Sequence, residues 1–520
     1  MSELLHAAVF AAVTLTAWLI PRHVAGARMG RPTAILSDVL PMLLGASLLL
    51  IATGRPIFVG FVVLSLGAGF ALADRSKREA LREPVVFSDM SELRHVFTHP
   101  QLYLPFAGPS LVIGGALATL ALGIGLLWLE PTLWQPNVLL IAFSFAAVSA
   151  IGWAIAREPA LGVAAAVLRR LDPSGEPVAD AAALGPFAAL LVYGVIARAE
   201  RAARRAAHPP VSSPAVVGVA AAVPLVLVQC ESFFDARRAS RSVPEDLLPG
   251  FDACLRRGGT TFGRLEVAGW GANTMRAEFA VLTGIPDRDL GYDRFNPYHA
   301  FARAPIGSLA WRLRREGYRT LCLHPFDRGF FRRDLTLRAL GFDDFLGRET
   351  LGGSSRPPYL SDPDLAHEVL RVLDETGPRT FIFVITMGNH GPWLENGPPI
   401  DPDLQRKFDP AGLPQGEQFL RYLDGLVRSD EMLRILSDGL GPRQRNGVFG
   451  FYGDHLPSLP HAFNHLHFDE WASDYVLMDG EPASARRLDL PAHHLPRLIL
   501  DRLGERNAVA GRQELALGAA

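Results

Sequence analysis

Cysteine is scarce in this chain of 520 residues. Cys230, Cys254 and Cys322 are the only cysteines, and they form no CxxC pair. Neither a disulfide framework nor a structural zinc site is therefore indicated. An excess of one charge is also lacking, because 51 Lys and Arg residues stand against 53 Asp and Glu residues, a formal net charge of -2. This balance argues against a nucleic-acid-binding protein, for which a broad basic surface is typical.

Apolar residues are abundant, at 49% of the chain, and they are concentrated in the first 200 residues. A membrane-spanning helix needs about 20 consecutive apolar residues. Five segments approach or reach this length: Leu4–Ile20, Ala34–Thr53, Ile57–Ala73, Ser110–Leu129 and Asn137–Ile155. A sixth, Ala181–Ala197, contains Gly185-Pro186 and could either span or lie in the membrane interface. We predict a transmembrane domain of five or six helices over residues 1–200.

The basic residues of this half bear on its orientation. Arginine and lysine gather in the first and third loops and again after the fifth apolar segment. The positive-inside rule places such loops in the cytoplasm, so that six spans would put the C-terminal half outside. Five spans with an internal N-terminus also put that half outside, but they leave the arginine-rich loops external. Both arrangements predict an extracytoplasmic C-terminal half, and the Arg- and Ala-rich composition favours a Gram-negative inner membrane.

The C-terminal half has a different pattern. Short, continuously apolar runs at 224–229, 318–324, 380–387, 447–453 and 474–478 alternate with helical periodicity at 309–317, 365–377 and 418–440. Buried strands separated by helices predict an α/β domain with a mostly parallel central sheet. We predict a linker or interfacial segment at 201–220, a catalytic domain at 221–503 and a flexible tail at 504–520.

Polar residues follow four of the predicted strands directly. They are Glu231, His324, His390 and the adjacent pair Asp454-His455. Ligands in such folds bind at the carboxyl ends of the strands, so these side chains are expected at one edge of the sheet. Carboxylate and imidazole ligands together suit a transition metal such as Mn²⁺ or Zn²⁺ better than Ca²⁺.

A hydroxyl group is available for chemistry at such a metal. The loop 269–274 leads into a predicted helix, Met275–Leu282, with Thr274 at the N-cap position. A hydroxyl at a helix N-terminus near a divalent cation can act as a nucleophile, and helix N–H groups can hold phosphate oxygens. A simple capping role for Thr274 is the alternative.

Five motifs, in their order along the chain, resemble lipoteichoic acid synthase-like phosphoglycerol transferases of the alkaline phosphatase/sulfatase superfamily. They are VQCESFF (228–234), WGANTMRAEFAVLTGIP (270–286), LHPFDRGFFRRD (323–334) with LGFDDF (340–345), TMGNHGPW (386–393) and YGDH (452–455). The resemblance covers roughly residues 220–480, and the apolar first half also fits it.

The resemblance implies a role for each matched residue. It implies a divalent metal, Mn²⁺ first and Zn²⁺ or Mg²⁺ as alternatives, held by Glu231, Thr274, Asp454 and His455. Thr274 would also be the nucleophile. The positions that contact glycerol phosphate in the family correspond to His324, Phe331, Arg333 and His390. Phe331 stands where the family often has Trp, and Met275 replaces the Ser of a common Thr-Ser pair, which leaves the head group and the acceptor open.

The implied reaction is transfer of phosphoglycerol from a phospholipid, such as phosphatidylglycerol, to a hydroxyl of an envelope glycan, polymer or lipid. A phosphothreonine intermediate would carry the head group. A phosphoethanolamine transferase and a phosphodiesterase or hydrolase of the same superfamily are alternatives. A sulfatase would need a Cys/Ser-x-Pro-x-Arg motif, which the sequence does not contain. A non-catalytic, membrane-anchored binding protein is the remaining alternative.

Overall fold

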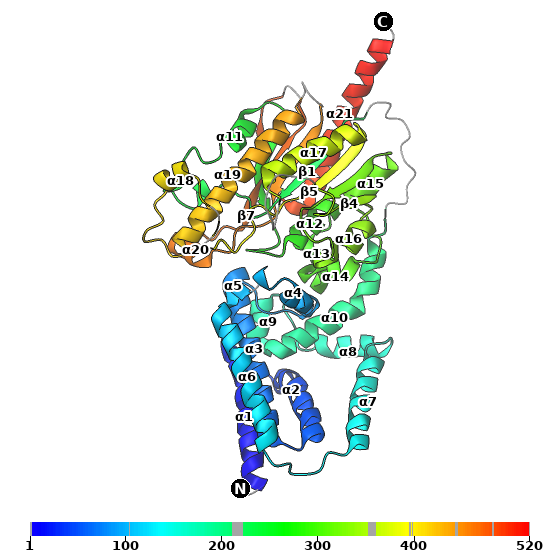
Figure 1. Cartoon of the computed structure of the whole chain (residues 1–520). Coiled ribbons are helices and arrows are strands. Elements are labelled where there is room, and N and C mark those ends of the chain that lie inside the picture. The colour runs from blue at the N-terminus through cyan, green and yellow to red at the C-terminus, as the bar shows by residue number, and fades with distance from the viewer. Residues whose placement is uncertain are drawn as a thin grey trace. The chain divides into compact units, whose positions relative to one another are not determined.

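The computed structural model divides into two compact units, Met1–Ala202 and Ala203–Ala520, both drawn in Figure 1. The structure describes residues 3–102, 104–210, 222–351, 360–394, 397, 399–441, 446–480 and 483–518. The part of the predicted linker beyond residue 210 lies outside these described residues.

In its described part, the first unit contains five helices that are long and apolar enough to cross a membrane. They are α1 (Glu3–Val24), α2 (Pro32–Thr53), α3 (Pro56–Leu81), α6 (Pro109–Leu129) and α7 (Val138–Ile155). The five predicted apolar helices are thereby confirmed. Shorter elements complete the unit: η1 (Phe87–Ser91), α4 (Leu93–Thr98), η2 (Pro100–Leu102), α5 (Leu104–Ala107), α8 (Ala160–Arg169), α9 (Pro177–Leu184) and α10 (Pro186–Ala207), which continues into the second unit.

The sixth apolar segment is divided between two helices. α9 ends before Gly185, whose φ is 100°, and α10 begins at Pro186. α10 ends in an arginine-rich turn that belongs to the second unit. There Arg204 forms a buried ion pair with Asp293, and Arg205 donates to the carbonyl of Ala300. These two arginines therefore bind protein groups, whereas an interfacial helix would turn them toward lipid head groups.

Helices α1 and α3 pack against each other at small residues. A Cβ atom on Gly67 would lie 2.4 Å from the carbonyl oxygen of Ala17, so the two backbones approach closely only because residue 67 is glycine. Ala17, Val59 and Val63 are buried in the cluster at this contact. By contrast, α6 and α7 bury no residue within the described part of the chain, as expected of helices whose apolar surface meets lipid.

Among the residues that the structure describes, the second unit is built on one sheet of nine strands in the order β4-β3-β5-β1-β6-β7-β2-β8, with β9 paired to β2. Only β7 runs antiparallel to its neighbours β6 and β2, so the predicted mostly parallel sheet is confirmed. The strands are β1 (Leu225–Cys230), β2 (Thr260–Glu266), β3 (Arg319–Leu323), β4 (Asp344–Leu346), β5 (Thr380–Ile385), β6 (Val448–Gly453), β7 (Ala472–Met478), β8 (Arg486–Arg487) and β9 (Leu490–Pro491).

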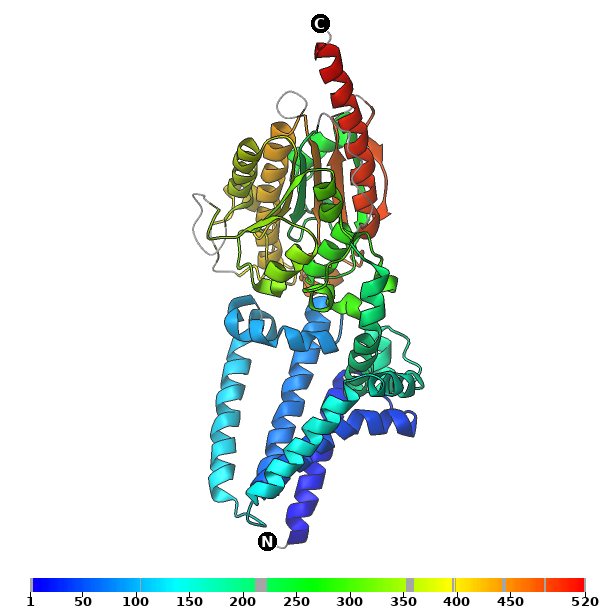
Figure 2. The same cartoon turned by 90° about the vertical axis from the view of Figure 1, so that its right-hand side faces the viewer.

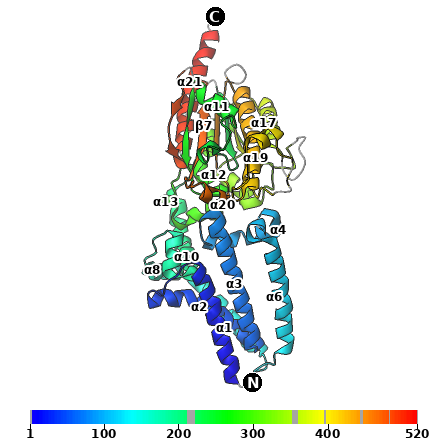
Figure 3. The ribbon, with the colours of Figure 1, turned by 90° about the vertical axis from the view of Figure 1, so that its left-hand side faces the viewer.

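Helices cover both faces of this sheet, as Figures 2 and 3 show from opposite sides. One face carries α11 (Pro249–Arg256), α17 (Asp362–Thr376) and α19 (Gly416–Gly439), and the other carries α12 (Thr274–Thr283), α15 (Leu309–Arg315) and α21 (Leu495–Gly518). The connecting helices are η3 (Ala236–Arg238), α13 (Asp287–Leu290), η4 (Gly291–Phe295), α14 (Pro297–Phe301), η5 (Phe330–Arg332), α16 (Arg333–Ala339), α18 (Pro402–Lys407), α20 (Pro460–His465) and η6 (Ala492–His494).

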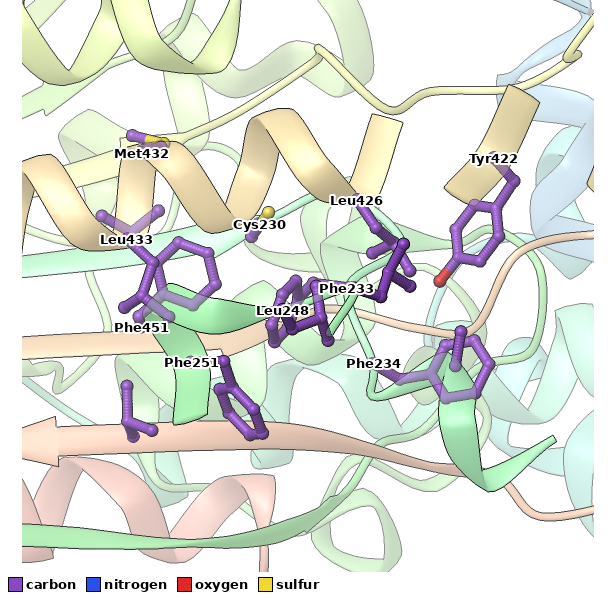
Figure 4. Close-up of a cluster of buried hydrophobic side chains, with 14 of the residues drawn as sticks. Cys230, Phe233, Phe234, Leu248, Phe251, Tyr422, Leu426, Met432, Leu433 and Phe451 are labelled. Atoms are coloured by element: carbon purple, nitrogen blue, oxygen red, sulfur yellow. The ribbon is translucent and has the colours of Figure 1, made fainter. Parts of the chain in front are cut away.

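Alternate residues of each central strand face the two helix layers. In β1, Val226 and Val228 belong to the core under α17 and α19, whereas Leu225 and Leu227 belong to the opposite core. Burial on both faces explains why these strands appear in the sequence as continuous apolar runs. Figure 4 shows the first core, in which Phe233 packs edge-on against Phe451 with ring centroids 5.0 Å apart.

Two elements differ from the sequence prediction. β2 alternates buried and partly exposed residues toward the edge of the sheet, so it lacks the continuous apolar run of a central strand. α21 continues to Gly518, through most of the segment predicted as a flexible tail. That segment is rich in Ala, Leu, Glu, Arg and Gln, which are the strongest helix formers.

Truncation of Phe451 should destabilise the second unit. Its side chain is 1% exposed and lies between Phe233 and the helix layer. Phe451→Ala is expected to lower the free energy of unfolding by about 3–5 kcal/mol. Phe451→Leu should lower it clearly less, because leucine leaves a smaller cavity than alanine and keeps more of the packing contacts. Denaturant unfolding of the detergent-solubilised chain measures both. Equal losses for the two variants would contradict this packing.

Candidate metal and phosphoryl-transfer site

The candidate site begins where β1 and β6 end. These strands pair in parallel with Cys230 opposite Gly453, so the next residues, Glu231 and Asp454, leave the sheet side by side. β2 is parallel to both strands and ends at Glu266 on the same edge. The observed register therefore explains why the polar residues that follow these strands meet at one edge of the sheet.

Glu231, Asp454 and His455 form a compact cluster of potential metal ligands. One ligand atom from each lies within 4.8 Å of the others. His455 Nε2 is 3.5 Å from Glu231 Oε1 and 3.3 Å from Asp454 Oδ2. All three residues are at most 4% exposed. Two carboxylates and an imidazole converging on one buried point are a donor set for a divalent cation.

The hydrogen bonds around the cluster leave one ligand atom of His455 and one of Asp454 directed at that point, whereas Glu231 Oε1 accepts from the Ser232 hydroxyl at 2.9 Å. His455 Nδ1 donates to the carbonyl of Leu456 at 2.9 Å, which leaves Nε2 as the acceptor. Asp454 Oδ1 accepts the backbone N–H groups of Ser232 and His455, whereas Oδ2 is buried and has no hydrogen-bond partner among the described residues. An unsatisfied buried carboxylate oxygen is costly without a cation, so the residues fit a metal.

Thr274 lies beside this cluster. Its hydroxyl oxygen is 3.3 Å from His455 Nε2, and the residue is 8% exposed. The loop before it is held to the loop after His455, because Gly271 N donates to the carbonyl of Leu456 at 3.1 Å. Asn273, with φ 69°, is the N-cap of α12, so Thr274 is the first helical residue and the predicted N-cap assignment was wrong by one position.

Burial dominates the electrostatics of the carboxylates. Burial, and then the neighbouring Asp454 carboxylate, raises the pKa of Glu231 from its ordinary 4.5 to about 8. His455 and Arg333 oppose this rise. The folded chain thus resists placing two negative charges at this point, which is the condition that a divalent cation would relieve.

His324 and Arg333 form a second buried group. His324 Nδ1 donates to the carbonyl of Ile385 at 3.1 Å, and its Nε2 accepts from Arg333 Nη1 at 3.2 Å. Burial, and then the charge of Arg333, holds the pKa of His324 well below its usual range. The guanidinium carbon of Arg333 lies 5.4 Å from the Phe331 ring centroid. His324 therefore orients Arg333, and both of its ring nitrogens are occupied.

His390 follows β5, and it keeps one ring nitrogen for other partners. Its Nδ1 donates to the carbonyl of Gly391, and Nε2 has no hydrogen-bond partner among the described residues. Burial lowers the pKa of His390, and the charges of Asp454 and Arg333 also act on it, with opposite signs. A neutral imidazole with an available Nε2 can accept a proton near these residues.

Left-handed backbone conformations adjoin several of these residues. Ser232 has φ 55° directly after Glu231, and Asn273 has φ 69° directly before Thr274. Phe331 and Arg332 have φ 53° and 58° directly before Arg333. Non-glycine residues rarely adopt this conformation, and they cluster at functional sites where surrounding contacts enforce it.

Sequence reasoning missed one buried group near Thr274. Glu278, Gln229 and Tyr298 join Arg333 in a hydrogen-bonded network. The available signal was the spacing of Thr274 and Glu278, which lie one turn apart on the same helix.

The fold and the site define a sheet-based domain that follows apolar helices and carries a cluster of potential metal ligands, and comparison with known proteins identifies its class. The chain carries a domain of the Sulfatase family, matched over residues 225–478. The superfamily predicted from the motifs is thereby confirmed.

One curated relative and one solved structure extend the match beyond this domain. Capsular polysaccharide biosynthesis protein RkpI of Rhizobium meliloti is 29% identical over 426 residues, 78% of this chain and 74% of RkpI. A second protein of that organism, named for modification of cyclic beta-1,2-glucan, is 30% identical over 244 residues, 45% of this chain and 36% of its own. Integral membrane protein lipooligosaccharide phosphoethanolamine transferase A (EptA) from Neisseria meningitidis covers 95% of both chains with 14% identity and a TM-score of 0.52, which shows a shared fold.

The raised pKa of Glu231 predicts how pH acts on the site. The pKa of Glu231 is about 8 in the folded chain and 4.5 ordinarily. Between these pH values, Glu231 keeps its proton in the cation-free folded chain and releases it in the unfolded chain. Stability should therefore fall as pH rises from about 4.5 to 8. Binding of Mn²⁺ displaces this proton, so its affinity should tighten about tenfold per pH unit up to about 8.

Calorimetric titration of the purified chain with Mn²⁺ at pH 6, 7 and 8 measures this effect. Glu231→Gln should bind the cation weakly and lose the pH dependence. Wild-type affinity in that variant would contradict the assignment of Glu231 as a ligand.

Proposed function

We propose that the chain is a metal-dependent transferase that moves a phosphoglycerol head group from a phospholipid to an acceptor hydroxyl. Phosphatidylglycerol is the proposed donor, and an envelope glycan, polymer or lipid is the proposed acceptor. The observation that carries the proposal is the position of the Thr274 hydroxyl, at the start of α12 and 3.3 Å from the imidazole of a three-residue ligand cluster. The ordered motifs shared with phosphoglycerol transferases support the choice of head group.

Glu231, Asp454 and His455, with the Thr274 oxygen, would hold a divalent cation, for which we propose Mn²⁺ over Zn²⁺ or Mg²⁺. When bound, such a cation lowers the pKa of a neighbouring hydroxyl and offsets negative charge on phosphoryl oxygens. The lone pair of His455 Nε2 and the unpartnered Asp454 Oδ2 support this location.

In the first step, Thr274 Oγ1 forms a bond to phosphorus and the ester bond to the diacylglycerol oxygen breaks. The threonine proton leaves the nucleophile, and the departing diacylglycerol oxygen gains a proton. In the second step, an acceptor hydroxyl loses its proton, bonds to phosphorus and releases Thr274 as a hydroxyl. Two attacks at one phosphorus thus return Thr274 unchanged and conserve charge.

The chain's own residues divide the remaining tasks. Arg333 would face the phosphoryl oxygens, where a buried guanidinium stabilises developing negative charge. His390 is the better proton carrier, because its Nε2 is available, whereas both nitrogens of His324 are engaged. His324 then acts by orienting Arg333.

The acceptor is proposed from the curated relatives. One is named for capsular polysaccharide biosynthesis and the other for modification of cyclic beta-1,2-glucan. Both names support an envelope glycan. Phosphoethanolamine transfer is the second candidate, favoured by the fold shared with EptA along almost the whole chain.

A trapping experiment separates these head groups. Chain incubated with phosphatidylglycerol, or with phosphatidylethanolamine, and then digested should carry phosphoglycerol on the Thr274 peptide only in the first case, as mass spectrometry would show. Thr274→Ala should lose the adduct and reduce turnover at least about 10³-fold, because the variant lacks the hydroxyl that attacks phosphorus.

Thr283→Ala is the matched control, since that hydroxyl lies on the same helix and donates to Phe279 O. It should keep both the adduct and the turnover. A phosphoethanolamine adduct on the Thr274 peptide would instead identify the chain as a phosphoethanolamine transferase. Full turnover by Thr274→Ala would reject Thr274 as the nucleophile.

We also propose an inner-membrane location with five spans, an internal N-terminus and an extracytoplasmic site. In the first unit, Arg28 N donates to the carbonyl of Ala182, and Asp38 accepts from Phe187 N and Ala188 N. The first loop and α9–α10 therefore lie on the same side, as they do when the four helices α2, α3, α6 and α7 cross between them.

This arrangement leaves basic loops outside, against the positive-inside rule. Several of these charges are neutralised within the unit. Arg22 pairs with Asp38 at 2.7 Å, and Lys77 pairs with Glu83 at 2.8 Å and with Asp89 at 2.6 Å. Arginine and lysine residues that are paired with acids influence the orientation of the helices in the membrane less than a simple count of basic residues in the loops suggests.

Cysteine labelling in intact cells tests the topology. The three native cysteines are buried, so single cysteines can be added at Gln135, between α6 and α7, and at Glu176, between α8 and α9. A membrane-impermeant maleimide should label Glu176→Cys in intact cells but Gln135→Cys only after permeabilisation. The reverse pattern would reject the arrangement of five spans with an internal N-terminus.

A further inference from the structure

Glu278 is a buried carboxylate that the proposed mechanism does not use. It lies on α12, four residues after Thr274, and it is 0% exposed. Residues at i and i+4 occupy the same face of a helix, one turn of about 5.4 Å apart. The helix that begins with the proposed nucleophile thus also carries an acid into the protein interior. A buried carboxylate is stable only when it is paired and hydrogen-bonded, so its partners define its role.

Four side chains from other elements converge on Glu278 or its neighbour. Arg333 Nη2 donates to Glu278 Oε2 at 2.9 Å, and Arg333 Nε is 3.3 Å from both oxygens. Gln229 Nε2 donates to Oε2 at 3.0 Å, and the Tyr298 hydroxyl donates to Oε1. The Tyr452 hydroxyl donates to Gln229 Oε1 at 2.6 Å, which turns the amide nitrogen toward the acid. Both carboxylate oxygens are therefore fully used.

This arrangement fixes the plane and direction of Arg333. Its Nε and Nη2 face Glu278, and its Nη1 faces His324 Nε2 at 3.2 Å. A guanidinium has five N–H groups. One on each terminal nitrogen has no hydrogen-bond partner among the described residues, and these two groups can bind two oxygens of one phosphoryl group. The side chain is 2% exposed, so solvent does not compete for them.

We propose that Glu278 is a positioning residue that holds Arg333 in the orientation required to bind the transferred phosphoryl group. The inference rests on the proposed phosphoryl transfer and adds the residue that orients its arginine. Because Thr274 and Glu278 share α12, the helix sets the separation between the attacking oxygen and the guanidinium. Glu278 also offsets the charge of Arg333 before substrate binds, when no phosphoryl group is present to do so.

The alternative is that Glu278 and Arg333 form only a structural ion pair. The two roles predict different couplings. If Glu278 acts through Arg333, its removal should have no further effect on catalysis once Arg333 is gone. If Glu278 only stabilises the fold, its removal should reduce the folded, metal-bound fraction and leave turnover per metal-bound chain unchanged.

The test is a double-mutant cycle on the purified, Mn²⁺-loaded full chain with Glu278→Gln, Arg333→Gln and the double variant. Turnover of labelled phosphatidylglycerol is expressed per bound Mn²⁺. Glu278→Gln should lower kcat about 10–100-fold with a smaller change in KM, and Arg333→Gln about 10²–10³-fold. The double variant should match Arg333→Gln within about twofold. Glu278→Asp, which keeps the charge on a shorter side chain, should recover part of the loss and covers the case in which Glu278→Gln does not fold.

Asp430→Asn is the matched control. Asp430 is also a helical carboxylate, 3% exposed, and it accepts only the N–H groups of Gly250 and Phe251 on the other face of the sheet. It should lower the melting temperature and leave turnover per bound Mn²⁺ unchanged. Losses by Glu278→Gln and Arg333→Gln that multiply in the double variant, or wild-type turnover by Glu278→Gln, would overturn the inference.

Binding of inorganic phosphate separates this inference from the proposed function. Calorimetry of the Mn²⁺-loaded chain should show phosphate binding at least about tenfold weaker in Glu278→Gln, with Mn²⁺ stoichiometry unchanged, because charge-assisted bonds to oriented N–H groups are lost. A wild-type chain that turns over no donor, yet shows this difference, would refute the transferase and keep the positioning role. Equal phosphate affinity in both chains would refute the positioning role, whatever the turnover.

Discussion

The parallel pairing of β1 with β5 and β6 is the constraint on which the site depends. Gln229 lies opposite Ile385 and Tyr452, and Cys230 lies opposite Gly453. The first residues beyond these strands therefore reach the edge together, and Glu231 N is tied to Thr386 Oγ1 at 2.9 Å. A shift of one residue would turn Asp454 to the opposite face and remove a potential metal ligand from the cluster. The two helix-covered cores fix this register, because each alternate strand residue has its own apolar layer.

Charge divides the interior behind this edge into two parts. Around Glu231 and Asp454 the acids exceed the bases, and an oxygen of Asp454 lacks a partner among the described residues. Around Arg333 the charges balance, because Glu278 takes up the guanidinium. A cation suits the first part and a phosphoryl group the second. Thr274, at the start of α12, lies beside the acids Glu231 and Asp454. One turn later on the same helix, Glu278 contacts Arg333.

The sequence revealed the parts of this arrangement that are local. Central strands buried on both faces appear as apolar runs, and the residues after them could be read off directly. β2 was missed because it lies toward the sheet edge and alternates with polar residues such as Arg264. The spacing of Thr274 and Glu278 is visible in the sequence, but the partners of Glu278 are not, because Gln229, Tyr298 and Arg333 come from distant segments. That both nitrogens of His324 are engaged, and that Asp454 Oδ2 is not, depends on atomic positions that no motif encodes.

The backbone around the site indicates what the rest of the fold must supply. A left-handed conformation costs a non-glycine residue roughly 1–2 kcal/mol. Ser232, Asn273, Phe331 and Arg332 all adopt it next to a site residue. Hydrogen bonds hold the three turns that contain these residues: Ser232 N to Asp454 Oδ1, Arg276 N to Asn273 O, and Asp334 N to Arg328 O.

The backbone strain and the crowding of Glu231 and Asp454 both destabilise the folded state. The two apolar cores must offset both costs, and a cation bound by the acids would remove the second. Stability and cation binding are therefore linked through the same three ligands, because the groups that would hold the metal are those that destabilise the protein without it.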